Sequence, residues 1–448
     1  MQTSEIVEKV LKHIEKGETA EVGKVLAQLH PADIAAVIEG LPSQHMLDAF
    51  HALATDLAAD VIVELADEPL DTILAQISLE EIAGLAKSMG SDEVADIIAE
   101  LSPENRAEVL SALPLKESTE VKELLKFPES SAGGIMDTNF TSVFKGMTVA
   151  SAINLLRERA PDPDELYYVY VVESDNKPIG YVTLADLLLA SEGKNIESIV
   201  EEFPDVVRVE DDQEKVASII NKYDLLGVPV VDELGVMRGV VRIDDAIDVL
   251  EEEATEDILR MGGADVTESV FTPTRRSVLK RLPWLYINLV TAIVAAGIVG
   301  LFTKTISAVV AVAVFMPVVA NMGGNAGTQT LAVTIRGLAV GELTFRNTWS
   351  FVLKEAVVGI LKGLAVGVVT AAIAYLWNGS IVLGLIIGLS LVINLLVGSL
   401  MGVMIPVTLR RMKLDPALAS GVFLTTITDA VGFFSILGLA TIFLGYLR

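Results

Sequence analysis

Five long apolar runs in the C-terminal part of the chain constrain its fold more than any other feature. They lie at about residues 284–303, 305–335, 351–377, 381–409 and 416–447. Crossing the hydrocarbon core of a bilayer takes about 20 residues of α-helix, and each run is long enough. Lipid offers no hydrogen-bond partners to a bare backbone, so such runs must be helical. This part of the chain is therefore expected to be a membrane domain of five α-helical spans.

The second run contains an unusual polar stretch. Met316 to Thr330 reads MPVVANMGGNAGTQT, with one proline, three glycines and three carboxamides in fifteen positions. Irregular backbone at membrane depth is tolerated only where protein buries it or where it lines a wet cavity, so the stretch predicts a pore or a binding site. The alternative is a kinked helix whose glycines let a neighbouring helix pack closely.

Charge divides the chain at the same point. From Trp284 onward there are nine basic and four acidic residues, whereas the preceding part has 24 basic and 56 acidic ones. The net charge of −27 argues against nucleic acid as a partner and favours cations. No apolar segment near Met1 resembles a signal peptide, so the acidic part is expected to stay in the cytoplasm. The lack of cysteine excludes thiolate metal sites and fits a reducing compartment.

Residues 1–130 repeat with a period of twelve. The segments LHPADIAAVIEGLP and LSPENRAEVLSALP match each other six periods apart. Proline is tolerated in a first helical turn and breaks an interior one, so each unit predicts a short helix followed by a corner. Stacked helices of this kind form an all-α superhelix. The apolar positions that mark the period are Leu29, Leu41, Leu53, Leu65, Ile77, Met89, Leu101, Leu113 and Leu125.

Residues 131–249 contain two copies of an α+β pattern. The expected helix, two strands and helix are 148–159, 167–172, 178–183 and 184–190, then 214–221, 228–232, 236–241 and 243–250. This pattern resembles a tandem pair of CBS domains, whose G-x-V-T-x-x-D signature matches GYVTLAD. The resemblance implies that Thr183 and Asp186 hold the ribose and phosphate of ATP or another adenine nucleotide. Arg242 stands where the second copy would have its threonine. CBS pairs that serve only as dimerisation scaffolds are the alternative.

Residues 250–283 are expected to form an acidic connecting helix and a hinge. Carboxylates occupy more than half of the positions from Asp244 to Asp257. Like charges three or four residues apart destabilise a helix by a few tenths of a kcal/mol per pair. Divalent cations would relieve this repulsion, because Mg²⁺ and Ca²⁺ prefer carboxylate and water oxygens. An ordinary solvated helix is the alternative.

Basic residues set the direction of the spans. They flank the start of the first span, the second-to-third connection and the end of the fourth span, while the other connections carry only Lys304 or no charge. The positive-inside rule then places the basic connections in the cytoplasm and the C-terminus outside. The spans hold one deep carboxylate, Asp429 in the TTITD run, which costs about 2.5–3.5 kcal/mol in a membrane helix and is read as functional.

The order of these parts, with GGNAGTQ in the second span and TTITDAVGFF in the last, resembles the MgtE family of magnesium transporters over essentially the whole chain. The chain is thus expected to be a multidomain membrane protein with its pore domain at 284–448. The resemblance implies a homodimeric, Mg²⁺-gated Mg²⁺ channel of the inner membrane, with the pore between subunits. The essential pore aspartate falls on Asp429. The cytosolic Mg²⁺ sites fall on Asp92, Asp96, Asp224, Asp245, Asp248, Glu252 and Glu253.

Physical reasoning adds neighbours to the pore aspartate. Mg²⁺ gives up its water reluctantly, so Asn325 and the backbone near Gly324 are expected to contact the water around the ion. A proton-coupled divalent-cation transporter and a membrane-bound nucleotide receptor are the competing functions. A proton relay usually needs several titratable groups, and the spans contain no histidine. No catalytic spacing is evident, so an enzyme is not expected.

Overall fold

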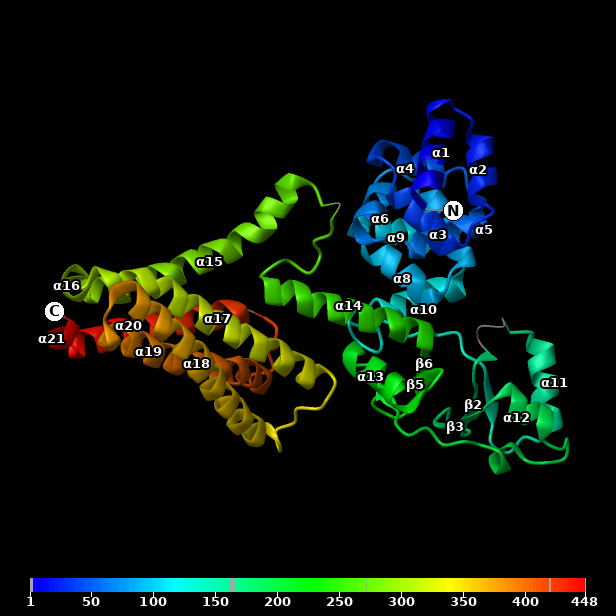
Figure 1. Cartoon of the computed structure of the whole chain (residues 1–448). Helices are drawn as coiled ribbons and strands as arrows, with labels where there is room; N and C mark the ends of the chain where they lie inside the picture. Colours follow the sequence, from blue (N-terminus) through cyan, green and yellow to red (C-terminus); the bar gives the residue numbers. More distant parts are fainter. Residues whose placement is uncertain (1–2, 162–165, 271, 419, 448) are drawn as a thin grey trace. The chain divides into compact units, whose positions relative to one another are not determined.

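The computed structural model describes residues 3–161, 166–270, 272–418 and 420–447. These form two compact units, Met1–Glu253 and Ala254–Arg448. Figure 1 shows the first unit from blue to green, with a helical part followed by two small sheets, and the second as a bundle of long helices.

Short helices fill the N-terminal part of the first unit at intervals of twelve residues. After α1 (Thr3–Glu15), successive helices begin at residues 19, 31, 43, 55, 67, 79, 91, 103 and 115. Pro31 and Pro103 take first-turn positions, where their missing amide costs nothing. The predicted repeat of helix and corner is confirmed. These helices are α2 (Thr19–Leu26), α3 (Pro31–Glu39), α4 (Ser43–Phe50), α5 (Thr55–Val63), α6 (Asp67–Leu74), α7 (Leu79–Leu85), α8 (Ser91–Ala99), α9 (Pro103–Ala112) and α10 (Leu115–Leu124).

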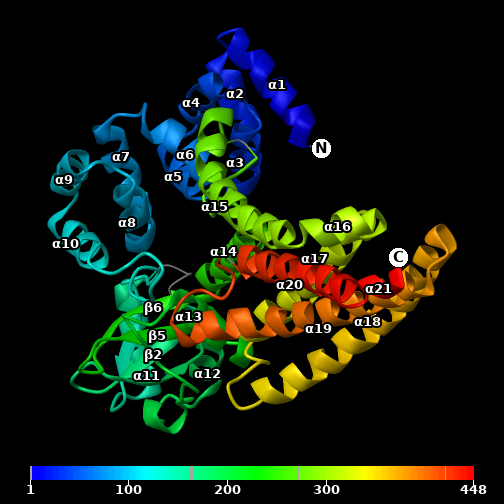
Figure 2. The ribbon, with the colours of Figure 1, turned by 90° about the vertical axis from the view of Figure 1, so that its left-hand side faces the viewer.

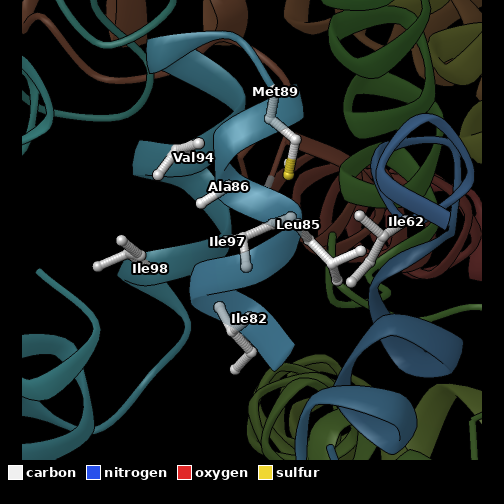
Figure 3. Close-up of a pocket in the computed structure, with 8 residues that line it drawn as sticks. All are labelled: Ile62, Ile82, Leu85, Ala86, Met89, Val94, Ile97 and Ile98. Carbon is white, nitrogen blue, oxygen red and sulfur yellow. The ribbon is translucent and has the colours of Figure 1, made fainter. Parts of the chain in front are cut away.

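The apolar positions of the repeat build the core of this part. Leu41, Leu65 and Leu101 are buried, and Met89 packs against the same cluster. Figure 3 shows one small cavity in this core, where α5, α7, the 3₁₀ turn η1 (Ala86–Ser88) and α8 meet. Because α8 turns its apolar side to this cavity, Asp92 and Asp96, four residues apart, share a different face. The lining residues are Ile62, Ile82, Leu85, Ala86, Met89, Val94, Ile97 and Ile98.

Two mixed three-stranded sheets complete the first unit. In each, the first strand runs parallel to the second and the second antiparallel to the third. The strands are β1 (Ser142–Phe144), β2 (Val169–Val172), β3 (Pro178–Val182), β4 (Val207–Arg208), β5 (Gly227–Val231) and β6 (Met237–Arg242). The helices are α11 (Val149–Arg159), α12 (Leu184–Leu189), the 3₁₀ turn η3 (Ile196–Ser198), α13 (Gln213–Tyr223) and α14 (Ile243–Gly262). The predicted hairpins and helices are confirmed. The sequence prediction omits β1 and β4, which are too short to show an alternation.

Among its described residues, the second unit contains five helices that are long and apolar enough to cross a membrane, as predicted. These are α15 (Thr274–Leu301), α17 (Val310–Ala339), α18 (Thr348–Asn378), α19 (Ile381–Arg411) and α20 (Ser420–Ile442). The second apolar run is divided, because the short α16 (Thr303–Ala308) precedes α17. Figures 1 and 2 show α16 and the terminal α21 (Leu444–Leu447) at one end of this unit. The α17–α18 and α19–α20 connections lie at the other end.

The second span is not interrupted, contrary to the expectation of irregular backbone. α17 is one continuous helix with Pro317 inside it. Its glycines allow α19 to approach closely, since a Cβ at Gly323 would lie 2.1 Å from Asn394 Nδ2. In return, a Cβ at Gly398 or Gly402 of α19 would lie 2.6 or 2.7 Å from a carbonyl oxygen of α17. The glycines of α17 therefore serve to let a neighbouring helix pack closely, which was the alternative interpretation of this stretch.

Glycines also bring α18 and α19 together. A Cβ at Gly363 would lie 2.7 Å from the Cα atom of Val392, and one at Gly367 would lie 2.8 Å from the Gly388 carbonyl oxygen. Because a backbone atom cannot move aside as a flexible side chain does, a larger residue must separate the two helices. Small residues therefore set the spacing of α17, α18 and α19.

Replacing Gly363 by alanine is expected to destabilise the membrane unit. The added methyl group meets the backbone of α19, and overpacking of this kind costs about 1–3 kcal/mol. The thermal unfolding temperature of the purified protein should fall. Gly297→Ala on α15 is the matched control, because no atom lies within 4 Å of the added methyl there. Equal unfolding temperatures for the two variants would contradict the packing argument.

Candidate functional site

α17 carries an uncovered polar face within the second unit. Asn321, Asn325 and Gln329 recur every four residues, so they share one side of the helix, and all three are exposed. Gly323 and Gly327, on another side, are buried. Carboxamides at membrane depth are costly against lipid, so this face indicates contact with water or with another protein surface.

Asp429 lies on α20, which packs beside α17. Its side chain is half-buried, while the preceding Thr428 is fully buried and donates its hydroxyl hydrogen bond to the Leu424 carbonyl oxygen at 3.0 Å. A Cβ at Gly324 would lie 3.9 Å from Thr428 Oγ1, so the Gly324 backbone lies close to this turn of α20. The structure thus places the predicted residues Asp429, Asn325 and Gly324 on two neighbouring helices.

Asn394 of α19 contacts both α17 and α20. It is fully buried, and its Nδ2 donates a hydrogen bond to the Val319 carbonyl oxygen of α17 at 2.8 Å. A Cβ at Gly432 of α20 would lie 2.8 Å from the same Nδ2. Asn394 Oδ1 has no hydrogen-bond partner among the described residues. The amide therefore holds α17, α19 and α20 in contact at the level of the polar stretch.

Sequence reasoning missed three charged residues inside α18, which are Lys354, Glu355 and Lys362. Glu355 is 7% exposed and accepts a hydrogen bond from the Thr330 hydroxyl at 3.0 Å. Lys362 Nζ donates to Gln329 Oε1 at 3.3 Å. The expectation of one deep carboxylate is therefore wrong, because Glu355 is buried two turns into a spanning helix. The signal in the sequence was the adjacent pair Lys354 and Glu355 near the start of an apolar run. Such a pair resembles the charged flank of a span.

A second polar group lies in the first unit, between α8 and the second sheet. We call Asp92, Asp137, Arg242 and Asp245 the buried acidic group. Asp92 is 5% exposed and its Oδ1 has no hydrogen-bond partner among the described residues. Asp137 is 2% exposed, accepts from the Asn139 amide at 2.8 Å and lies 3.1 Å from the Arg242 guanidinium. The Arg242 guanidinium thus pairs with Asp137, and the charges of Asp245, Asp92 and the exposed Asp244 also act on it.

Burial and mutual repulsion keep protons on these carboxyls near neutral pH. Burial, and then the charge of Asp137, raise the pKa of Asp92 to about 7. Burial and the charge of Asp92 raise the pKa of Asp245 to about 8. Burial raises the pKa of Asp137 as well. The group is short of positive charge, which a bound cation would supply.

Asp96 and Glu252 lie at the edge of this group. Surrounding protein and the charge of Asp92 raise the pKa of Asp96 to about 7, with Glu252 adding repulsion. Because the Asp96 side chain is exposed, water screens its charge. Asp92 and Asp245 are therefore the stronger indication of a cation site. The structure therefore brings Asp92, Asp96 and Asp245 into one neighbourhood and adds Asp137, which no motif or repeat had indicated.

The other predicted ligands have separate environments. Asp224 is exposed and ends α13 in the left-handed conformation at φ 51°. Asp248 is exposed on α14, where partial burial and Asp244 raise its pKa. Glu253 Oε1 accepts a hydrogen bond from Gln213 Nε2 at 2.9 Å. Across the described ranges, no three or more histidine, aspartate and glutamate side chains gather closely enough to hold a metal ion.

The two CBS-like copies use the same local geometry for different purposes. Thr183 caps α12, its amide donates to Asp186 Oδ2 at 2.9 Å, and the two side chains form a capping box. In the second copy the Arg242 amide donates to Asp245 Oδ2 at 3.0 Å. The first copy keeps the hydroxyl and carboxylate expected for a nucleotide, whereas the second contributes its pair to the buried acidic group.

Acidification from pH 8 to pH 6 is expected to stabilise the metal-free protein. The folded carboxyls bind protons with pKa values of about 7 for Asp92 and about 8 for Asp245, whereas an unfolded aspartate loses its proton near pH 4. Stability is therefore lost as pH rises from about 4 to about 8 and then levels off. Thermal unfolding in a chelator across this range measures the effect. Asp92→Asn should flatten the curve and the exposed Asp33→Asn should not; a curve that rises with pH would contradict the burial argument.

Comparison with known proteins agrees with this architecture. The model of a divalent cation transporter family, MgtE, matches residues 316–439, that of the MgtE intracellular N domain matches 29–130, and that of the CBS domain matches 132–193 and 196–252. The magnesium transporter MgtE of Thermus thermophilus is 33% identical over 96% of this chain and 97% of its own length. That of Bacillus subtilis is 30% identical over 99% and 98%.

A solved structure resembles the first unit. The crystal structure of the cytosolic domain of the Mg²⁺ channel MgtE in complex with ATP has a TM-score of 0.51 and 29% identity. The match covers 54% of this chain and 99% of the chain in the solved structure. The family models match a helical N domain, a CBS pair and the membrane part of this chain, and the relatives are named as transporters and not as enzymes. The chain belongs to the MgtE family of magnesium transporters.

Proposed function

We propose that this membrane protein is a magnesium channel that mediates Mg²⁺ uptake and closes when cytosolic Mg²⁺ binds its acidic first unit. The observation that carries the regulatory part is the buried acidic group, in which Asp92 of α8 and Asp245 of α14 repel each other. Mg²⁺ prefers carboxylate oxygens and would replace the protons held there. Binding would draw α8 and α14 together, and α14 continues into the second unit.

The proposed pore lies between two copies of the chain. The exposed carboxamides of α17 and the half-buried Asp429 fit a surface that a second copy completes. Two-fold symmetry would place two Asp429 carboxylates across one axis, and their paired charge favours a divalent ion. The hydrated ion would contact Asn325 and the backbone at Gly324 through its water. In this proposal the α17–α18 and α19–α20 connections face the cytoplasm and the C-terminus lies outside.

The proposed cytosolic sites are the acidic group and the carboxylates that continue along α14. Asp92, Asp96 and Asp245 do not yet form a metal-binding group in this structure, and they would share one ion only once α8 and α14 are drawn together. Asp224, Asp248, Glu252 and Glu253 would hold others. Several weak sites that act together suit a sensor of millimolar Mg²⁺. The ATP complex of the related cytosolic domain supports an adenine nucleotide at Thr183 and Asp186 of the first CBS copy.

A proton-coupled transporter is the second candidate, and Glu355 favours it. A buried carboxylate inside a span, in addition to Asp429, gives a proton pathway a second titratable group. Uptake of Mg²⁺ into liposomes with and without a proton gradient separates the two mechanisms. A channel carries Mg²⁺ down its own gradient whether or not the pH differs across the membrane.

Asp429→Ala is expected to abolish Mg²⁺ flux into such liposomes while the protein stays folded. Asp429→Asn should reduce flux severely, because the amide keeps the shape of the side chain but loses the charge that attracts the ion. Glu342→Gln removes an exposed carboxylate from the α17–α18 connection and is the matched control. Normal transport by folded Asp429→Ala protein would refute the assignment of the pore.

Removing the α14 carboxylates should weaken inhibition by cytosolic Mg²⁺. Fewer ligands lower the affinity of the closed state, so the half-inhibiting concentration should rise about five-fold or more. Flux against internal Mg²⁺ measures the shift, and limited proteolysis of the first unit should lose its protection by Mg²⁺. A control with the same change in charge replaces four exposed carboxylates of the N-terminal helices. An unchanged half-inhibiting concentration would exclude these residues as sensors. The test variant combines Asp245→Ala, Asp248→Ala, Glu252→Ala and Glu253→Ala; the control combines Glu8→Ala, Glu15→Ala, Asp33→Ala and Glu80→Ala.

A further inference from the structure

The C-terminal part of α14 contacts the connection between α19 and α20 inside the second unit. The Arg260 guanidinium forms ion pairs with Glu256 of its own helix and with Asp415 of this connection. The other carboxylate oxygen of Asp415 accepts a hydrogen bond from the Ala417 amide at 2.6 Å. One carboxylate therefore links Arg260 to the backbone turn that leads into α20.

Apolar packing reinforces this contact. Met261 packs against a cluster that includes the fully buried Ala417 and Leu424. A Cβ at Gly421 would lie 3.2 Å from the Met261 carbonyl oxygen, so the backbones of α14 and α20 are close there. Gly421 lies two turns before Asp429 on the same helix. The end of α14 thus contacts the first turns of the helix that carries the candidate pore carboxylate.

We propose that Arg260 is a positioning residue that couples α14 to α20 through Asp415. Glu256 holds the guanidinium from one side, so its planar fork reaches Asp415 in a defined orientation. When α14 changes position, the Asp415 turn and the start of α20 move with it, and Asp429 changes its place in the pore. This inference rests on the proposed closure by cytosolic Mg²⁺ and names the contact that transmits it.

Neighbouring ion pairs of the hinge do not provide the same link. Arg281 Nε donates to Glu268 Oε1 at 2.8 Å, and Lys280 Nζ lies 3.4 Å from Asp265 Oδ1. Both pairs fasten the segment after α14 to the first turns of α15, and neither includes a residue of α20. The Glu268–Arg281 pair therefore offers a matched control with the same chemistry and a different helix.

Exchange of the two charges tests the coupling. In liposomes containing the full chain, Arg260→Glu should raise the half-inhibiting Mg²⁺ concentration about five-fold or more and leave uptake at low internal Mg²⁺ unchanged. Asp415→Arg should do the same, and the double variant should recover part of the shift, because the ion pair forms again while Glu256 and the Ala417 amide lose their partners. The control exchange, Glu268→Arg with Arg281→Glu, should shift nothing. Wild-type inhibition of either single variant would overturn the proposal, as would a folded double variant whose half-inhibiting concentration is no lower than that of the single variants.

A milder pair covers the case in which charge reversal prevents folding. Asp415→Asn keeps an oxygen for the Ala417 amide and loses the ion pair, and Arg260→Gln removes the same ion pair from the other side. Each should raise the half-inhibiting Mg²⁺ concentration, and both together should raise it no further than either alone. Additive shifts would show that the two residues act separately and would overturn the coupling.

Cross-linking tests the contact independently of inhibition. The chain contains no cysteine, so Arg260→Cys with Asp415→Cys introduces the only two thiols. A short thiol-reactive cross-linker should join them, and it should not join Arg260→Cys with Gly438→Cys, further along α20. Absence of the first cross-link would overturn the contact. If this cross-link forms but internal Mg²⁺ does not inhibit the unmodified chain, the proposed regulation is refuted while the contact stands.

Discussion

The first unit is governed by the repulsion between the buried Asp92 and the partly buried Asp245. Asp92 and Asp245 come from helices that are far apart in the chain, yet packing of α8 against the second sheet forces their charges together. Arg242 supplies one positive charge, and it already pairs with Asp137. Leaving carboxylates in this state is costly unless protons or cations neutralise them. We propose that this shortage of positive charge gives the first unit an affinity for cations.

The membrane unit depends on close helix packing instead. Glycines, which have no side chain, let its helices approach each other. Glycines of α17, α18 and α19 let backbones meet at distances that a single methyl group would disrupt. Buried polar groups such as Asn394 and Glu355 then hydrogen-bond across the closely packed helices. Tight packing of this kind transmits a shift at one end of a helix along its length, because close-packed helices do not deform continuously.

Local signals in the sequence predicted much of this architecture. The twelve-residue repeat gave the helix starts of the first domain, because proline and the apolar spacing act within one helical turn. The continuity of α17 was not predictable in the same way. Whether Gly323 breaks a helix or admits a neighbour depends on α19, which lies some 70 residues further along the chain. Asp137 was missed for a similar reason, since its partners Asp92 and Arg242 become neighbours only through tertiary packing.

The number of protons released on Mg²⁺ binding shows directly whether the ion replaces protons in the buried acidic group. If Mg²⁺ replaces protons in the buried acidic group, adding it to lightly buffered protein at pH 7 should release protons, and Asp92→Asn should reduce the release. Release should fade as pH rises well above 8, where the carboxyls are already ionised. Mg²⁺ binding without proton release at pH 7 would contradict the account.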